Sequence, residues 1–150
     1  MSLEKIAVAL SLEQKLLEPL YQWGMRFEWS NIKEVNLFHI IKKNVTPLEF
    51  GLVELPDEKT IESMKPTLDQ FMKEEAKKII PQSYHPQIKI HIWGDFHPKE
   101  KAIDFLQNSK VDLVVCSTRG LHGARAIFQS SFADHLIKFA PCDVLVVRPS

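Results

Sequence analysis

The sequence predicts a single α/β domain spanning residues 1–150 and built on a doubly wound, five-stranded parallel sheet. Five short apolar runs alternate with longer amphipathic stretches. Most of these runs are apolar at successive positions, which is typical of strands that helices bury on both faces. Parallel strands joined by helices need right-handed crossovers, and these place helices on both sides of the sheet. A length of 150 residues suits one domain with a substantial core.

The predicted strands span residues 5–10, 34–41, 88–93, 111–116 and 144–147. The first of them, KIAVAL, is apolar on both faces, whereas the third alternates and is closed by Gly94. Residues 42–56 lie between the second strand and the next helix. Their Pro47, Gly51 and Pro56 predict a loop.

The predicted helices span residues 12–28, 57–80, 99–108 and 125–139. Each carries apolar side chains at helical spacing, which gives one face to pack on the sheet. Pro19 should kink the first helix or displace its start, and Pro66 should break the second into a short and a longer piece. Asp57, directly after Pro56, is the expected N-cap of that second helix.

The predicted ligand site lies where the strand order reverses. In doubly wound sheets, ligands bind beyond the carboxyl ends of the strands at that point. In a sheet of order 3-2-1-4-5 the first and fourth strands flank it, so residues 11–13 and 117–131 are the informative segments. Only five glycines occur in the chain, and their positions exclude both a dinucleotide fingerprint after the first strand and a P-loop. In the remaining loop, STRGLHGA, Gly120 and Gly123 allow close backbone approach to an anion.

The composition favours a cytoplasmic protein without nucleic-acid or membrane partners. Nineteen basic and nineteen acidic side chains cancel, so the chain lacks the positive charge that nucleic acids normally require. No apolar run approaches the ~20 residues of a membrane span, and residues 1–10 do not resemble a signal peptide. The two cysteines, Cys116 and Cys142, are expected to be reduced, buried thiols.

The sequence offers no catalytic or metal constellation. Ser117, Ser130 and Ser131 lack the G-x-S-x-G elbow of a hydrolase nucleophile. His85, His91 and His97 fall in a loop, a strand and another loop, so no metal site is expected from them. A phosphoacceptor receiver domain shares the five-stranded architecture, but it needs an acidic pair after its first strand, where this chain has Ser-Leu-Glu at 11–13.

The segment VDLVVCSTRGLHGARAIFQSSFADHLIKFAPCDVLVVRP, residues 111–149, resembles the C-terminal half of a universal stress protein. The resemblance extends to the first strand, to the end of the second at residues 37–40, and to Gly94 and Asp95; it is weakest over residues 42–86. It implies an adenine nucleotide alpha-hydrolase-like, Rossmann-like fold. It also implies a protein that acts in the stress response by binding and not as an enzyme.

Family members that bind ATP carry G-x2-G-x9-G followed by Ser or Thr, and an Asp at the end of the first strand. The corresponding positions here are Ser117, Gly120, Ser130, Ser131 and Ser11, so two of three glycines and the acidic residue are missing. Each Gly-to-Ser change adds a Cβ where the backbone should approach the ligand. The resemblance therefore implies a degenerate nucleotide site, whose candidate residues are Ser11, Ile40, Cys116, Ser117, Gly120, Gly123, Ser130, Ser131 and Phe132.

The expectation is a binding protein with no cofactor and no ordinary ATP binding, for which a nucleotide is the candidate small-molecule ligand. The alternative is an ATP-binding, slowly hydrolysing switch that uses the loop of residues 117–131.

The last predicted strand should be a dimer interface. Residues 144–147 are apolar on both faces yet lie at the sheet edge, and an exposed apolar edge invites pairing. We expect the same strand of a second subunit to pair with it antiparallel about a two-fold axis. An axis between Leu145 and Val146 places Asp143 opposite Arg148. Members of the universal stress protein family, which this sequence resembles, similarly dimerise through this strand. The predicted interface residues are Asp143, Val144, Leu145, Val146, Val147 and Arg148.

Overall fold

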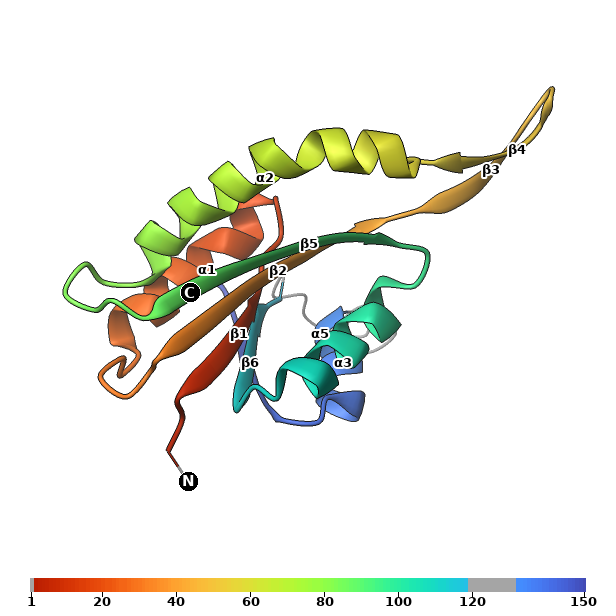
Figure 1. Cartoon of the computed structure of the whole chain (residues 1–150). Helices are drawn as coiled ribbons and strands as arrows, with labels where there is room; N and C mark the ends of the chain where they lie inside the picture. Colours follow the sequence, from red (N-terminus) through yellow and green to blue (C-terminus); the bar gives the residue numbers. More distant parts are fainter. Residues whose placement is uncertain (1, 119–131) are drawn as a thin grey trace.

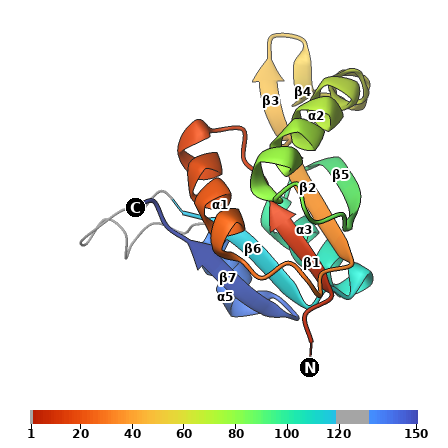
Figure 2. The ribbon, with the colours of Figure 1, turned by 90° about the vertical axis from the view of Figure 1, so that its left-hand side faces the viewer.

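The computed structural model describes residues 2–118 and 132–150. Its main sheet contains β1 (Lys5–Ala9), β2 (Glu34–Lys42), β5 (Gln87–Asp95), β6 (Leu113–Ser117) and β7 (Asp143–Val147). These strands are ordered β5-β2-β1-β6-β7, and every neighbouring pair is parallel (Figures 1 and 2). In chain order of the five strands this is 3-2-1-4-5, so the predicted α/β fold and strand order are confirmed.

Helices cover both faces of the sheet. The helices α1 (Gln14–Arg26) and α2 (Glu58–Ile79) lie on one face, and α3 (Pro98–Ser109) and α5 (Phe132–Phe139) lie on the other (Figure 1). Successive strand residues point to opposite faces, so Ile6 and Val8 pack with the side chains of α1 and α2. Ala7 between them packs with the side chains of α3 and α5. All three side chains are fully buried, which explains the continuous apolar run in β1.

The helices α1 and α2 are in unusually close contact. A Cβ added at Gly24 would lie 1.9 Å from the carbonyl oxygen of Ile79, so glycine is required there. The Tyr21 hydroxyl donates a hydrogen bond to the buried carboxylate of Glu75. Burial, together with this carboxylate, raises the pKa of Tyr21 well above its usual range. A glycine contact and a polar contact thus join the two helices.

The expectation that Pro66 breaks the second helix is wrong, because α2 is continuous across it. Proline removes one backbone hydrogen bond from a helix interior. Here the buried face continues on both sides of Pro66, through Ile61 before it and Leu68 and Met72 after it, and this packing outweighs the lost bond. The predicted N-cap is confirmed, since Asp57 Oδ1 accepts a hydrogen bond of 2.8 Å from the Thr60 amide.

The helix α1 begins at Gln14, two residues later than predicted, and Pro19 lies buried inside it. Of the last predicted helix, residues 132–139 are described and form α5, whereas residues 125–131 lie outside the described part of the chain.

The expected loop at residues 42–56 is also wrong. It contains β3 (Asn44–Leu48) and β4 (Gly51–Leu55), an antiparallel hairpin that projects from the body of the molecule (Figures 1 and 2). The turn has two residues, after which Gly51 adopts a φ of 128°, a conformation open mainly to glycine. Hydrogen-bonded and non-hydrogen-bonded residue pairs alternate along an antiparallel ladder, and Pro47–Leu52 is a non-hydrogen-bonded pair. The hairpin therefore loses no backbone hydrogen bond because of the proline.

Candidate functional site

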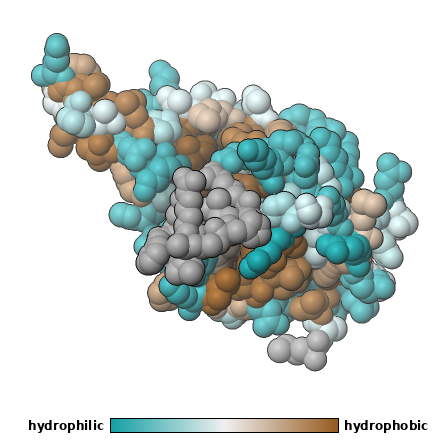
Figure 3. All heavy atoms as spheres, turned by 180° about the vertical axis from the view of Figure 1, so that it is seen from behind, coloured by the Kyte–Doolittle hydropathy of each residue, from teal (hydrophilic) through white to brown (hydrophobic). Residues whose placement is uncertain are grey.

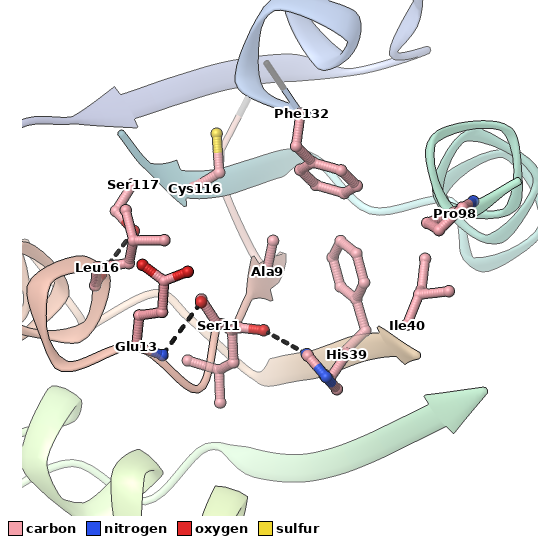
Figure 4. Close-up of a pocket in the computed structure, with 12 residues that line it drawn as sticks. Ala9, Ser11, Glu13, Leu16, His39, Ile40, Pro98, Cys116, Ser117 and Phe132 are labelled. Atoms are coloured by element: carbon pink, nitrogen blue, oxygen red, sulfur yellow. Dashed lines mark hydrogen bonds between the residues drawn. The ribbon is translucent and has the colours of Figure 1, made fainter. Parts of the chain in front are cut away.

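A pocket of about 240 Å³ lies at the carboxyl ends of β1, β2 and β6 (Figure 4). This is the point where the strand order reverses, because β2 and β6 flank β1 on opposite sides. The lining comes from these three strands, the segment before α1 and its first turn, and the first residues of α3 and α5. The lining residues are Ala9, Leu10, Ser11, Glu13, Leu16, Phe38, His39, Ile40, Pro98, Cys116, Ser117 and Phe132.

One side of the pocket is apolar. Figure 4 shows Phe132, Pro98 and Ile40 together on that side, contributed by α5, α3 and β2. The Phe38 ring is buried with its centroid 6.4 Å from that of Phe132. Ala9 ends β1 with a small side chain and leaves room between these walls. A flat, largely apolar group matches this lining.

The other side is polar, but its hydroxyl groups already bond to the main chain. Ser117 Oγ donates to the carbonyl oxygen of Leu16 at 2.6 Å, so its single proton is used within the protein. Ser11 Oγ accepts from the amide of Glu13 at 3.2 Å. Figure 4 shows the Glu13 carboxylate on the side formed by Leu16 and Ser117. In this arrangement Ser117 offers a ligand an acceptor and no donor, which suits hydroxyl or amino groups better than an anion.

His39 adds a second polar group to the pocket. Its Nδ1 lies 2.9 Å from the carbonyl oxygen of Leu10. A carbonyl accepts hydrogen bonds only, so Nδ1 carries the proton, and in the neutral ring Nε2 is an acceptor. The position of this proton is assigned from the contact, because hydrogens are not located directly.

Cys116 forms part of the pocket wall and is 2% exposed. Burial raises the pKa of its thiol to about 12. The thiolate is the reactive form of cysteine, so this residue packs and does not act as a nucleophile. Burial also raises the pKa of the half-buried Cys142.

The structure brings together several predicted site residues. Those that line the pocket are Ser11, Ile40, Cys116, Ser117 and Phe132. Gly120, Gly123, Ser130 and Ser131 lie outside the described residues. A role for any of the nine in binding a ligand stays a prediction.

Sequence reasoning missed several lining residues: Ala9, Leu10, Leu16, Phe38, His39 and Pro98. Glu13 lay within the segment of residues 11–13 that the strand order singled out. Alternation along β2 could have pointed from Ile40 to Phe38, which shares its face. Pro98 reaches the site from the start of α3 and has no local sequence signal.

Outside the pocket, His91 belongs to a structural network. Its Nε2 lies 2.9 Å from Oδ1 of the buried Asn36. Burial lowers the pKa of the His91 ring, so the neutral form is favoured. Among residues 2–118 and 132–150, no cluster of three His, Cys, Asp or Glu side chains is suited to a metal. The same described residues include no helix with the length and apolar character to cross a membrane.

Comparison with known proteins agrees with this fold. A model of the universal stress protein family matches residues 3–148. A universal stress protein of Methanocaldococcus jannaschii is 30% identical over 116 residues, which make up 77% of this chain and 66% of that relative. The match thus spans just under two thirds of the relative's length.

Two solved structures illustrate the shared fold. A universal stress protein in complex with cAMP has a TM-score of 0.69 at 15% identity, and the match covers 100% of both chains. One from Archaeoglobus fulgidus in complex with dAMP has a TM-score of 0.58 at 16% identity, over 98% of this chain and 99% of the other. Identities this low show the fold alone. Because the family model matches nearly the whole length, this chain belongs to the universal stress protein family.

Proposed function

We propose that this chain acts in the stress response by binding a small ligand without turning it over, and that its pocket takes an adenine mononucleotide or nucleoside in preference to ATP. The observation that carries the proposal is the pocket at the strand switch point, apolar on one side and polar on the other, where Ser117 and Glu13 offer acceptors. Its volume of about 240 Å³ lies just below the roughly 300–1,000 Å³ of most ligand sites, so a small ligand is the first candidate.

The charge at the rim supports the same preference. The Glu13 carboxylate and the acceptor lone pairs of Ser117 are suited to the amino group of a base or the hydroxyls of a sugar. The triphosphate of ATP offers no such donors, so it gains nothing from these groups. Two relatives of the same fold were solved with cAMP and with dAMP, so adenine mononucleotides are the first ligands to test.

Thermal unfolding with each nucleotide tests the proposal. A ligand at one hundred times its dissociation constant adds about 2.7 kcal/mol of stability, which moves a midpoint by several degrees. We expect AMP, cAMP or dAMP at millimolar concentration to raise the midpoint more than Mg-ATP does. Ala9→Leu, which fills the pocket, should abolish the shift. Leu12→Ala, at an exposed neighbour that does not line the pocket, should preserve it.

No shift with any nucleotide would contradict the proposal. A larger shift with Mg-ATP, together with phosphate release that Ala9→Leu abolishes, would favour the ATP-binding switch. Gly120 and Ser131 match the pattern of ATP-binding members and are the reason to keep ATP in the experiment.

We also propose that the chain forms a homodimer through β7. This strand pairs with β6 on one side, and no strand of the described residues pairs with its other edge. Beside it lies a groove of about 500 Å³ whose lining includes Leu145, Trp23 and Phe27. An unpaired apolar edge next to an apolar groove favours pairing with a second copy. Sedimentation that shows only a monomer at micromolar concentrations would argue against this dimer.

A further inference from the structure

The projecting hairpin, residues 44–55, concentrates exposed apolar surface, and we refer to it as the arm. Of the eleven large hydrophobic side chains exposed in the described part of the chain, five lie in these twelve residues. They are Val45, Leu48, Phe50, Leu52 and Leu55, with Phe50 at the tip 81% exposed and Leu52 76% exposed. Figure 3 shows this apolar surface on the extension that leaves the body. Exposed apolar side chains concentrated in this way are typical of an interaction site.

The arm is apolar on both faces. Residues opposite each other in an antiparallel pair share a face, so Val45, Pro47 and Leu52 lie on one face and Leu48, Val53 and Leu55 on the other. A two-stranded hairpin alone is marginally stable in water, and further strands or a packed helix are needed to stabilise it. A further strand paired with the arm would therefore add to its stability.

The root of the arm is held firmly. The Lys43 side chain is 8% exposed and its Nζ pairs with the carboxylates of Glu54 and Glu58, at 2.6 Å from the latter. Its ammonium also lies 5.0 Å from the centre of the Phe96 ring. These contacts join the arm to the first turn of α2 and to the segment after β5. The direction in which the arm projects is thus set by the body.

The two edges of the arm differ in their capacity to bind another strand. The pair Pro47–Leu52 is non-hydrogen-bonded within the hairpin, so the polar backbone groups of both residues face outward. On the β3 edge this position is a proline, which has no N–H to donate. On the β4 edge, Leu52 and Glu54 each present both an N–H and a C=O. The edge of β4 is therefore the one able to take a further antiparallel strand.

We propose that β4 pairs antiparallel with β4 of a second copy of this chain, about a two-fold axis at Val53. Val53 is the centre of this five-residue strand, so this register uses all five residues. Leu52 then exchanges backbone bonds with the partner's Glu54, and Gly51 leaves room for the partner's Leu55. Moving the two-fold axis by one residue, to Glu54, slips the pairing by two residues and sets Glu54 against the partner's Glu54, and like charges directly opposite are destabilising.

Several properties favour a second copy as the occupant. The tip residue Phe50 falls opposite the partner's Pro56, so the apolar tip of each arm packs on the root of the other. The chain has zero net charge, so two copies do not repel each other strongly. Each arm also offers the other its five exposed large apolar side chains.

This contact is separate from the proposed dimer at β7. The arm continues from β2, whereas β7 is the strand at one edge of the sheet, and two other strands lie between them. Two isologous contacts on one chain join dimers into a larger assembly. Each contact can therefore be removed without removing the other.

Cysteine cross-linking tests the register. Two-fold pairing at Val53 places its Cα about 4.5 Å from that of the partner's Val53, within the range of a disulfide. In a Cys142→Ser background, Val53→Cys should form a reducible dimer under mild oxidation. The matched variant Leu55→Cys should not, because Leu55 lies opposite the partner's Gly51. The buried Cys116 does not compete.

Sedimentation tests the surface. Phe50→Ser with Leu52→Ser should weaken association at least tenfold, and Met25→Ser, at an equally exposed apolar residue on α1, should leave it unchanged. The substituted side chains are exposed, so the fold is retained. Equal masses for the wild-type protein and the double variant at every concentration would overturn the proposal. Cross-linking of Leu55→Cys as readily as Val53→Cys would overturn the register. Neither result depends on whether β7 also forms a contact.

Discussion

Glu34 joins three neighbouring strands at the amino end of the sheet, opposite the pocket. Its carboxylate lies 2.7 Å from Lys89 Nζ on β5 and 3.2 Å from Lys5 Nζ on β1. It also accepts a hydrogen bond of 2.9 Å from the buried amide of Asn36. The contact with Lys89, followed by that with Asn36, lowers the pKa of Glu34 to about 2. The ionised carboxylate is thus part of how the strands are held in register.

The pH dependence of stability should reveal this carboxylate. A folded-state pKa below the unfolded value means that Glu34 stabilises the fold above about pH 4.5 and loses this effect as the pH falls toward 2. Glu34→Gln should lower the free energy of unfolding by about 1 kcal/mol at pH 7, and the two proteins should converge toward pH 2. Urea unfolding at pH 7, 4 and 3 measures the difference.

Glu62→Gln provides the matched control, because Glu62 and its partner Lys65 are both exposed on α2. That substitution should change stability by less than about 0.5 kcal/mol. A constant difference between wild type and Glu34→Gln from pH 7 to 3 would contradict the role assigned to Glu34.

At the level of single residues, the strand ends were predictable and the partners of their side chains were not. Ser11 and Ser117 follow strands that flank the switch point, so their place at the site follows from strand order alone. The hydrogen bond from Ser117 to Leu16 depends on where α1 begins, and Pro19 made the first residue of this helix unpredictable from the sequence. The polarity that the pocket presents therefore required the three-dimensional structure.

At the level of elements, proline and glycine misled sequence reasoning twice, in different ways. Pro47, Gly51 and Pro56 suggested a loop, although apolar residues at Val45 and Leu52 fit a short hairpin equally well. Pro66 suggested a helix break, but a buried face on both sides kept α2 continuous. Packing against residues distant in sequence kept the helix continuous, and the geometry of the ladder allowed a proline within the hairpin.

Lys43 should control the order of the arm. Lys43→Met removes its pairing with Glu54 and Glu58 and releases the arm from α2. We expect backbone amides of residues 44–55 to exchange with solvent roughly tenfold faster in dilute protein, while those of β1 keep their protection. Hydrogen–deuterium exchange with mass spectrometry measures both regions.

Lys42→Met is the control, since the exposed Lys42 donates only to the Phe96 carbonyl oxygen, at 3.0 Å. Similar exchange in the arm of both variants would show that Lys43 does not hold it.

Gly24 should be the most sensitive position of α1. Gly24→Ala brings a methyl group against the Ile79 backbone, which has no flexible side chain to yield, so the helices must separate. A loss of about 2–3 kcal/mol in the free energy of unfolding is expected. Gln22→Ala, exposed on the same helix, should change stability by no more than about 0.5 kcal/mol. Chemical denaturation of both variants checks this, and equal stabilities would refute the close-packing argument.

For the whole molecule, the order of strands could be predicted because it follows from general rules. Alternating strands and helices, right-handed crossovers and two-sided apolar strands leave few topologies, and the observed order is among them. The resemblance over residues 111–149 reinforced this choice. Nothing comparable constrains residues 42–86, where a hairpin such as the arm changes the surface without changing the sheet.

The β7 dimer makes a prediction at this scale. Leu145→Lys places a charge in the apolar groove beside the free edge and should shift the sedimentation coefficient toward that of a smaller species. Ile88→Lys is the matched control, because Ile88 is a partly exposed residue on β5 at the other edge of the same sheet. Circular dichroism should show that both variants are folded. If the two variants retain the same mass as the wild type, β7 is not the interface.

The burial of Cys116 has a consequence for how the pocket withstands oxidants. Because burial raises its pKa to about 12, almost none of this thiol is ionised at pH 7. Hydrogen peroxide and disulfides react with the thiolate, so this sulfur is converted only very slowly to sulfenic acid or a mixed disulfide. The wall of the pocket therefore keeps its shape and its apolar character in an oxidising cell. The proposed ligand site therefore contains a sulfur that resists oxidants, as suits a protein that acts under stress.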